Sequence, residues 1–141
     1  MDRENERSPP FTKSMTHEDR MAYRIGRGEQ GVLTFEPYKS HLLPLWRFRT
    51  PPIAKKSAQD LWKCFEEFYE QHDFIGMDMT RKFIQMGMTR AKRQELPKST
   101  SHAGKNEKEQ ASQVFRKYWQ RCKSHEGYQK LKEEFIQQQK S

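Results

Sequence analysis

One apolar stripe constrains this chain more than any other feature of its sequence. Between residues 53 and 69, apolar side chains recur at steps of three and four residues, the spacing of one helix face. The stripe follows Thr50-Pro51-Pro52, where threonine can cap a helix and proline is tolerated in the first turn. The sequence therefore predicts a helix that runs to about Gln71. The apolar members of the stripe are Ile53, Ala54, Ala58, Leu61, Trp62, Phe65, Phe68 and Tyr69.

The remaining core must come largely from aromatic and methionine side chains, because the chain is polar. Hydrophobic residues make up 33% of its 141 residues and charged residues another 33%, whereas aromatic residues reach 12%. Aromatic rings bury a large area per side chain, so a few of them can build a small core. A chain of this length is expected to form one domain.

Two short segments predict a small sheet. Residues 32–35, Val-Leu-Thr-Phe, are typical of a strand and are soon followed by a proline. Residues 45–49, Leu-Trp-Arg-Phe-Arg, alternate apolar and basic side chains, so a strand would place the two rings on one face and the arginines on the other. We therefore expect an α+β fold, with a two- or three-stranded antiparallel sheet packed against about four helices.

Helical patterns continue in two further parts of the chain. A second helix is predicted to start near Ile75 and to be capped by Gly87, and residues 88–93 either continue it or begin another. Asn106, with a glutamate three residues later, fits a capping box and starts a third helix. Gly127 interrupts that pattern, and a short last helix follows it.

These elements suggest four segments. Residues 1–20 are polar and are expected to form a flexible tail, and residues 21–96 form the α+β core. Residues 97–105 are rich in serine, threonine and glycine and are predicted to be a linker. Residues 106–141 form a C-terminal helical segment that packs on the core.

The net charge of +8 favours an anionic partner: nucleic acid, a phosphorylated ligand or an acidic protein surface. The alternative is that the charge serves solubility alone. No apolar run approaches the length of a membrane span, and the N-terminus is too polar for a signal peptide. We expect no membrane contact and a cytosolic location, or a nuclear one reached by diffusion.

A glycine-rich loop at residues 26–31, Gly-Arg-Gly-Glu-Gln-Gly, is the first candidate site. Backbone N–H groups exposed by glycines can cradle a phosphate, and Arg24 or Arg27 can add a bidentate contact. The loop lacks the Gly-Lys-Ser/Thr of a P-loop, and it precedes a predicted strand where a dinucleotide fingerprint would precede a helix. The alternative is a turn packed beneath the sheet.

Two basic clusters are the next candidates. The segment around Trp46 combines cations with aromatic rings, as proteins that bind single-stranded nucleic acid do, and bases could stack on its rings. The alternative is that these rings are buried in the core. The run from Arg81 to Arg93 can lie along phosphates, or it can be a solvated helix face. No pattern identifies base readout. The candidate phosphate-binding residues are Arg24, Gly26, Arg27, Gly28, Lys39, Trp46, Arg47, Arg49, Arg81, Arg90, Lys92 and Arg93.

Carboxylates offer an enzymatic alternative. Glu29, Asp73 and Asp78 lie in basic surroundings and could form a catalytic centre, or they could serve as a helix cap and ion-pair partners. The two cysteines have no CxxC spacing, and the histidines are scattered, so we expect buried reduced thiols, no metal and no cofactor. Cys64 lies on the apolar helix face, where thiols are usually inert.

Part of the chain resembles a family known as a domain of unknown function in microbes and phages. The resemblance rests on Tyr-Arg-Ile-Gly-Arg-Gly-Glu-Gln-Gly-Val-Leu at 23–33, Glu-Pro-Tyr-Lys at 36–39, Trp-Arg-Phe at 46–48, and residues 73–79 running into 81–83. It implies no activity, because the family has no assigned chemistry.

The sequence thus favours a non-enzymatic nucleic-acid-binding protein that contacts the phosphate backbone without strong sequence specificity. One alternative is a small enzyme acting on a nucleotide or nucleic acid, with Glu29 and Asp78 as its polar centre. That reading requires the carboxylates to converge with Arg27 in one pocket. The other is an adaptor whose C-terminal helices dock on an acidic protein.

Overall fold

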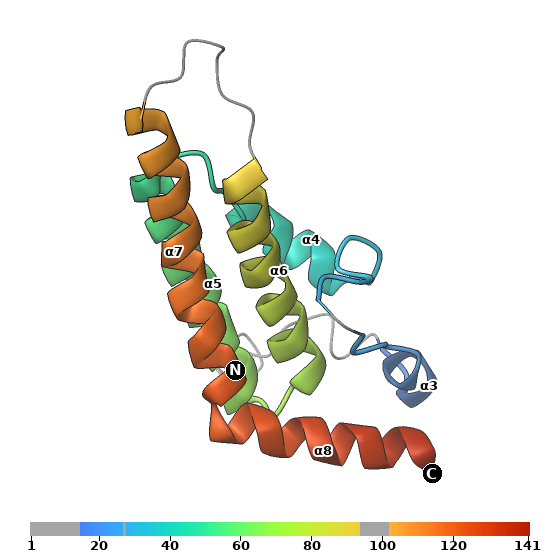
Figure 1. The fold of residues 1–141 in the computed structure, drawn as a ribbon. Helices are drawn as coiled ribbons and strands as arrows, with labels where there is room; N and C mark the ends of the chain where they lie inside the picture. Colours follow the sequence, from blue (N-terminus) through green and yellow to red (C-terminus); the bar gives the residue numbers. More distant parts are fainter. Residues whose placement is uncertain (1–14, 27, 94–101) are drawn as a thin grey trace, which may run out of the picture.

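The computed structural model describes residues 15–26, 28–93 and 102–141, without the side chains of 102–104. In this part of the chain, helices joined by turns and short loops form the whole fold (Figure 1). The elements are α3 (His17–Met21), α4 (Tyr38–Leu42), the 3-10 helix η1 (Leu43–Leu45), α5 (Pro51–Glu70), α6 (Phe74–Arg93), α7 (His102–Ser124) and α8 (Glu126–Lys140).

The α+β prediction is wrong, because the described residues contain no strand. Residues 32–35 form turns instead. The Val32 N–H donates to the Glu29 carbonyl at 3.2 Å, and the Thr34 N–H donates to the Gly31 carbonyl at 3.2 Å. These local bonds satisfy backbone groups that a strand would pair with a neighbour, and they override the β propensity of the side chains.

The second predicted strand, residues 45–49, is also absent. The Ser57 hydroxyl of α5 donates to the Leu45 carbonyl at 2.6 Å and accepts from the Arg47 N–H at 2.9 Å. A helix side chain therefore takes the place of a partner strand. The expected alternation of faces is nevertheless present, because Trp46 and Phe48 are half-buried with ring centroids 4.9 Å apart, and the two arginines are exposed.

The helix predicted from the apolar stripe is confirmed as α5. Its N-cap is Thr50, whose hydroxyl accepts from the Ile53 N–H at 3.4 Å, and Gln71 is its C-cap. At the two ends of the stripe, Ile53 and Tyr69 are about two-fifths exposed, at 41% and 38%, and Trp62 between them is half-buried. The buried residues of α5 are Ala54, Ser57, Ala58, Leu61, Cys64, Phe65 and Phe68.

Helix α6 is continuous, so the expected cap at Gly87 is wrong. Gly87 lies against α7, where a Cβ atom would come within 2.6 Å of Cε1 of Phe115. Glycine is required there because the two helices approach closely, and not because the helix ends. At the start of α6, Asp73 accepts from the Gly76 N–H at 3.1 Å, as a helix cap does.

The C-terminal boundaries also differ from those predicted. Helix α7 begins at His102, so Asn106 lies inside it and not at its N-cap. The break between α7 and α8 is at His125, two residues before the predicted Gly127. His125 has extended backbone angles (φ −69°, ψ 117°), and its Nδ1 accepts from the Tyr128 N–H at 3.0 Å. A histidine N-cap therefore redirects the chain into α8.

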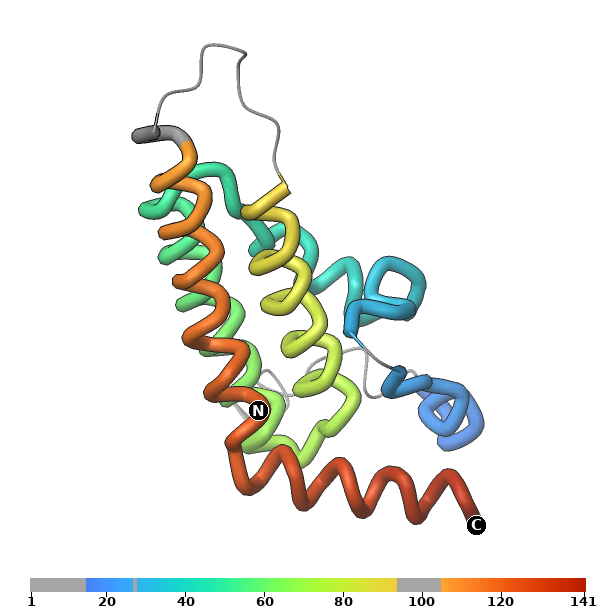
Figure 2. The backbone as a smooth tube through the Cα atoms, in the orientation of Figure 1, coloured from blue at the N-terminus to red at the C-terminus, as the bar shows by residue number. Residues whose placement is uncertain are grey.

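Helices α5, α6 and α7 run alternately up and down as a three-helix bundle, and α8 crosses one end of it (Figure 2). The loop and short helices that precede α5 lie beside α6, and their Tyr23, Val32, Tyr38 and Leu42 enter the same core as the bundle. No helix among the described residues has the length and hydropathy needed to span a bilayer.

The tail predicted over 1–20 and the linker predicted over 97–105 fall largely outside the described residues. Residues 17–21 form α3, and residues 102–105 belong to the beginning of α7. From α7 and α8, Ala111, Phe115, Cys122, Tyr128 and Phe135 join the core formed with α5 and α6. The described helices therefore share one core.

Candidate functional site

Helix α6 carries a buried polar face at the centre of the molecule. Asp78 is completely buried, and its carboxylate accepts from the hydroxyls of Tyr23 at 2.5 Å and Tyr128 at 2.6 Å. Arg81 adds two bonds to Oδ1, from Nε at 3.1 Å and Nη2 at 2.7 Å. Burial and the Asp78 charge both raise the pKa of the two tyrosines, so they remain neutral donors.

The same face of α6 anchors the glycine-rich loop. Lys82 Nζ donates to the carbonyls of Arg24 at 2.8 Å and Gln30 at 2.7 Å. Arg81 Nη1 donates to the Gly28 carbonyl at 2.6 Å. Burial lowers the pKa of Lys82 to about 8, while Asp78, 4.0 Å away, opposes that shift. The loop is thus attached through its carbonyls to two buried cations.

A pocket of about 390 Å³ opens where this loop meets α6, α7 and α8, and we call it the loop pocket. Gly26 and Gly28 line one side, with positive φ angles of 59° and 65° that favour glycine. Three cations from three different helices, Arg81, Lys123 and Lys132, are among the residues that line the other sides. No carboxylate is among the described residues that line it. The pocket is therefore electropositive.

Gln85 has a fixed orientation in the loop pocket. Its Oε1 accepts from Arg81 Nη1 at 3.1 Å and from Trp119 Nε1 at 3.1 Å. Both partners are obligate donors, so the oxygen must face them and the amide nitrogen must face the other way. Within the described part of the chain, that nitrogen has no hydrogen-bond acceptor. A Cβ at Gly28 would lie 3.3 Å from it, so glycine leaves it room.

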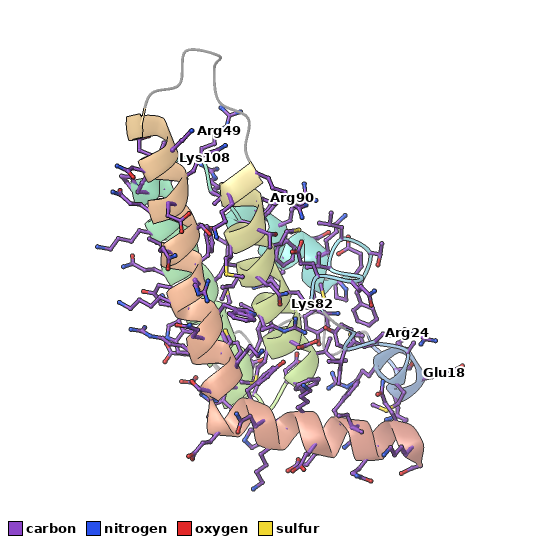
Figure 3. All side chains as sticks on the ribbon, in the orientation of Figure 1. Glu18, Arg24, Arg49, Lys82, Arg90 and Lys108 are labelled. Carbon is purple, nitrogen blue, oxygen red and sulfur yellow. The ribbon has the colours of Figure 1, made fainter. Side chains whose placement is uncertain are left out.

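The two basic clusters predicted from sequence meet at the other end of the bundle. Residues 46–50 lead into the start of α5, and α6 runs antiparallel to α5, so these residues lie near the end of α6 (Figure 1). Figure 3 shows Arg49 and Arg90 at this end, with Lys108 of α7. We define the basic end as the exposed side chains Arg47, Arg49, Arg90, Lys92 and Arg93.

Nearby acidic side chains only partly offset the positive charge of the basic end. Lys92 lies 3.9 Å from Glu109 of α7, and Glu107 is exposed on the same turn. Both lysine and glutamate of that pair are about half exposed, so the interaction is weak. Lys105 and Lys108 of α7 add two more cations to this region.

The remaining predicted residues lie elsewhere. Lys39 is on α4, 3.4 Å from Glu36, and belongs to neither the loop pocket nor the basic end. The side chain of Arg24 is exposed beside the loop, outside the lining of the loop pocket. Arg81 is 6% exposed and is occupied by protein acceptors. Arg27 falls outside the described residues.

Trp46 is packed against the protein. Its ring centroid lies 6.1 Å from that of Phe83 in α6, and its indole N–H is buried with no partner among the described residues. A ring in this position has limited area on which a base could stack. We therefore assign Trp46 to the packing of the bundle.

The three candidate carboxylates lie apart from the loop pocket, and their position relative to Arg27 falls outside the described residues. Asp78 is enclosed, and Asp73 accepts from the Tyr38 hydroxyl at 2.7 Å with its pKa raised by burial. Glu29 accepts from the Thr89 hydroxyl at 2.8 Å. None of the three lines the loop pocket, and the described residues contain no group of three metal-ligating side chains.

Sequence reasoning missed Gln85, Trp119, Lys123 and Lys132. The glycine loop was identified, but the residues that face it come from α6, α7 and α8. Their spacing along the chain carries no motif, because only the turn at His125 brings α8 beside the loop. The one signal was the surplus of basic residues in the C-terminal segment.

Comparison with known proteins identifies the family of the chain. No curated protein and no solved structure matches the chain. The sequence model of a family described as a domain of unknown function, DUF4385, matches residues 6–138. The match includes the C-terminal helices as well as the glycine-rich loop and the bundle. The chain therefore belongs to the DUF4385 family of domains of unknown function.

Proposed function

We propose that the protein binds nucleic acid non-enzymatically, through phosphate contacts at the basic end. The observation that supports this most is the convergence of two clusters that are far apart in sequence. Arg47 and Arg49 precede α5, whereas Arg90, Lys92 and Arg93 end α6, and the antiparallel arrangement places both at one end of the bundle. All five side chains are exposed.

The helix ends add to the positive electrostatic potential at the basic end. Helices α5 and α7 both start at the basic end, and helix N-termini carry partial positive charge. Helix α6 ends there, and its own Arg90, Lys92 and Arg93 offset the partial negative charge of its C-terminus. Arginine forks suit bidentate phosphate contacts, so four of the five cations are well matched to a phosphate backbone.

The proposal includes no base readout. Trp46 is committed to packing, and Arg81 is committed to Asp78 and Gly28. The remaining contacts are cationic, and cations neutralise phosphates whatever the sequence. We expect comparable binding of different sequences and a strong dependence on salt.

Fluorescence anisotropy with labelled single- and double-stranded DNA and RNA tests this proposal. Each phosphate neutralised in a duplex contributes roughly −0.9 to the slope of log K against log salt. The double variant Arg90→Ala/Arg93→Ala should weaken binding to every sequence and flatten that slope by up to about 2. Its matched control is Lys130→Ala/Lys140→Ala, which removes two exposed cations from α8.

Two outcomes would overturn the proposal. One is the absence of binding to any of these nucleic acids at about 50 mM salt, where phosphate contacts are strong. The other is an equal loss of affinity in the control variant, which would show that net charge matters and the basic end does not.

A further inference from the structure

We propose that the loop pocket binds a small phosphate-bearing molecule of about nucleotide size. The pocket lies beside the turn from α7 to α8, whereas the basic end lies where α6 ends. It is therefore a second site, and its ligand is a free small molecule. The proposal stands independently of nucleic-acid binding at the basic end.

The sign of the charge on the ligand follows from the cations that line the pocket. Lys132 is half-buried and has no charged or hydrogen-bonding partner among the described residues. Lys123 Nζ lies 4.5 Å from the centroid of the Trp119 ring, which holds the ammonium by a cation–π contact and leaves its donors available. Two such ammonium groups without a carboxylate favour a ligand that carries negative charge.

The amide of Gln85 narrows the chemistry further. Arg81 and Trp119 fix its oxygen, so its nitrogen presents two N–H donors in a set direction. A ligand that binds this nitrogen must supply hydrogen-bond acceptors. Phosphate offers several acceptor oxygens together with charge, and it matches both the amide and the lysines.

Size and rigidity are consistent with a small organic phosphate. A volume of about 390 Å³ falls within the range of roughly 300–1,000 Å³ that is usual for small-molecule sites. The pocket wall is held in advance, because Arg81 and Lys82 bind the loop carbonyls and Asp78 holds Arg81. Binding then needs little ordering of the protein.

Titration calorimetry with inorganic phosphate, AMP and adenosine as probes tests the proposal. AMP is expected to bind, phosphate to bind more weakly and adenosine to bind least, because the phosphate supplies the charged contacts. Lys132→Ala should weaken AMP binding by about tenfold, the loss of one charge-assisted bond. Lys130→Ala, which removes an exposed lysine of α8 outside the pocket, should leave it unchanged.

Gln85→Glu separates binding from folding. A carboxylate at this position still accepts from Arg81 and Trp119, so the melting temperature should stay close to that of the parent protein. It also replaces the amide donors with a negative oxygen, so AMP binding should be lost. Arg90→Ala/Arg93→Ala should bind AMP normally, which separates this site from the basic end.

Four results would overturn the proposal, the first three of which concern AMP and phosphate. Those three are no heat of binding with AMP or phosphate at millimolar concentration, equal weakening by Lys132→Ala and Lys130→Ala, or AMP binding that survives Gln85→Glu. Adenosine binding as tightly as AMP would also count against it, because recognition would then not involve the phosphate.

Discussion

The Tyr128 hydroxyl donates to Oδ1 of Asp78 at 2.6 Å and thereby connects α8 to the first part of α6. Asp78 lies near the start of α6 and Tyr128 lies in the first turn of α8, 50 residues later. The same carboxylate binds Tyr23 from the N-terminal loop and Arg81 from α6. One buried charge therefore joins the N-terminal loop, α6 and α8.

Removing that charge should destabilise the whole fold. Asp78→Ala leaves Arg81 buried without its counter-charge, and breaking a buried pair in this way typically costs about 3–5 kcal/mol. Tyr128→Phe removes a single donor and should cost about 1 kcal/mol, because Asp78 keeps its other partners. Urea denaturation followed by tryptophan fluorescence measures both. Equal small losses would mean that Asp78 does not hold the network together.

Phe65 should be the most sensitive position on α5. It has no exposed surface, and its ring centroid lies 5.1 Å from that of Trp62 and 5.8 Å from that of Tyr128. Phe65→Ala should cost about 3–5 kcal/mol in urea denaturation, the usual range for a buried phenylalanine. Ile53→Ala on the same helix, at a 41% exposed position, is the control and should cost less than half as much.

Gly87→Ala should destabilise the protein although alanine favours helices by about 1 kcal/mol over glycine. The new methyl group would meet the ring of Phe115, which is buried and cannot move aside. Thermal denaturation should show a lower melting temperature. In a Phe115→Leu background the same substitution should be neutral or stabilising, because the ring edge is gone. Additive effects in this double-mutant cycle would refute the contact.

Stability should fall in alkali partly through Cys64. Burial, with the nearby Glu67 and Asp60 charges, raises the pKa of this thiol from 9.0 to about 11. Between these values the unfolded chain releases the proton and the folded chain keeps it. The contribution to stability is therefore complete below pH 9 and is lost as pH rises toward 11, with a slope of at most about 1.4 kcal/mol per pH unit.

The variant Cys64→Ala isolates the contribution of this thiol to the pH dependence of stability. Denaturation free energies of parent and variant should converge between pH 9 and pH 11, because all other groups titrate alike in both. Parallel pH profiles would show that the folded thiol titrates normally.

Local signals in the sequence were sufficient for α5. Its cap, its two prolines and its apolar spacing all act within a few residues, so they can be recognised without knowledge of the fold. The strand predicted over 32–35 failed because local turn bonds to Glu29 and Gly31 replace strand pairing there. The strand predicted over 45–49 failed because its outcome depends on a distant group. Ser57 lies 12 residues from Leu45, and its bonds to that segment cannot be read from alternation of side chains.

The candidate site was predictable only in part. The loop glycines and the basic residues before α5 and at the end of α6 were identified by type and spacing. Their grouping was not, because it depends on the antiparallel packing of α5 and α6 and on the turn at His125. Arg81 is an example of a residue whose role was predicted wrongly for this reason. Its charge indicated a surface contact with phosphate, but its position in α6 opposite Gly28 makes it part of the interior.

A substitution at Trp46 tests whether this residue packs in the bundle or stacks on nucleic-acid bases. Its indole N–H is buried without a partner, and an unsatisfied buried donor costs about 1–3 kcal/mol. Trp46→Phe removes that penalty while keeping an aromatic ring against Phe48 and Phe83, so its net effect on urea denaturation should be below about 1.5 kcal/mol. The ratio of single-strand to duplex affinity should not change, because the ring is packed on the bundle. A selective loss of single-strand binding in this variant would show that bases stack on Trp46, and it would require the segment to leave α6 when nucleic acid binds.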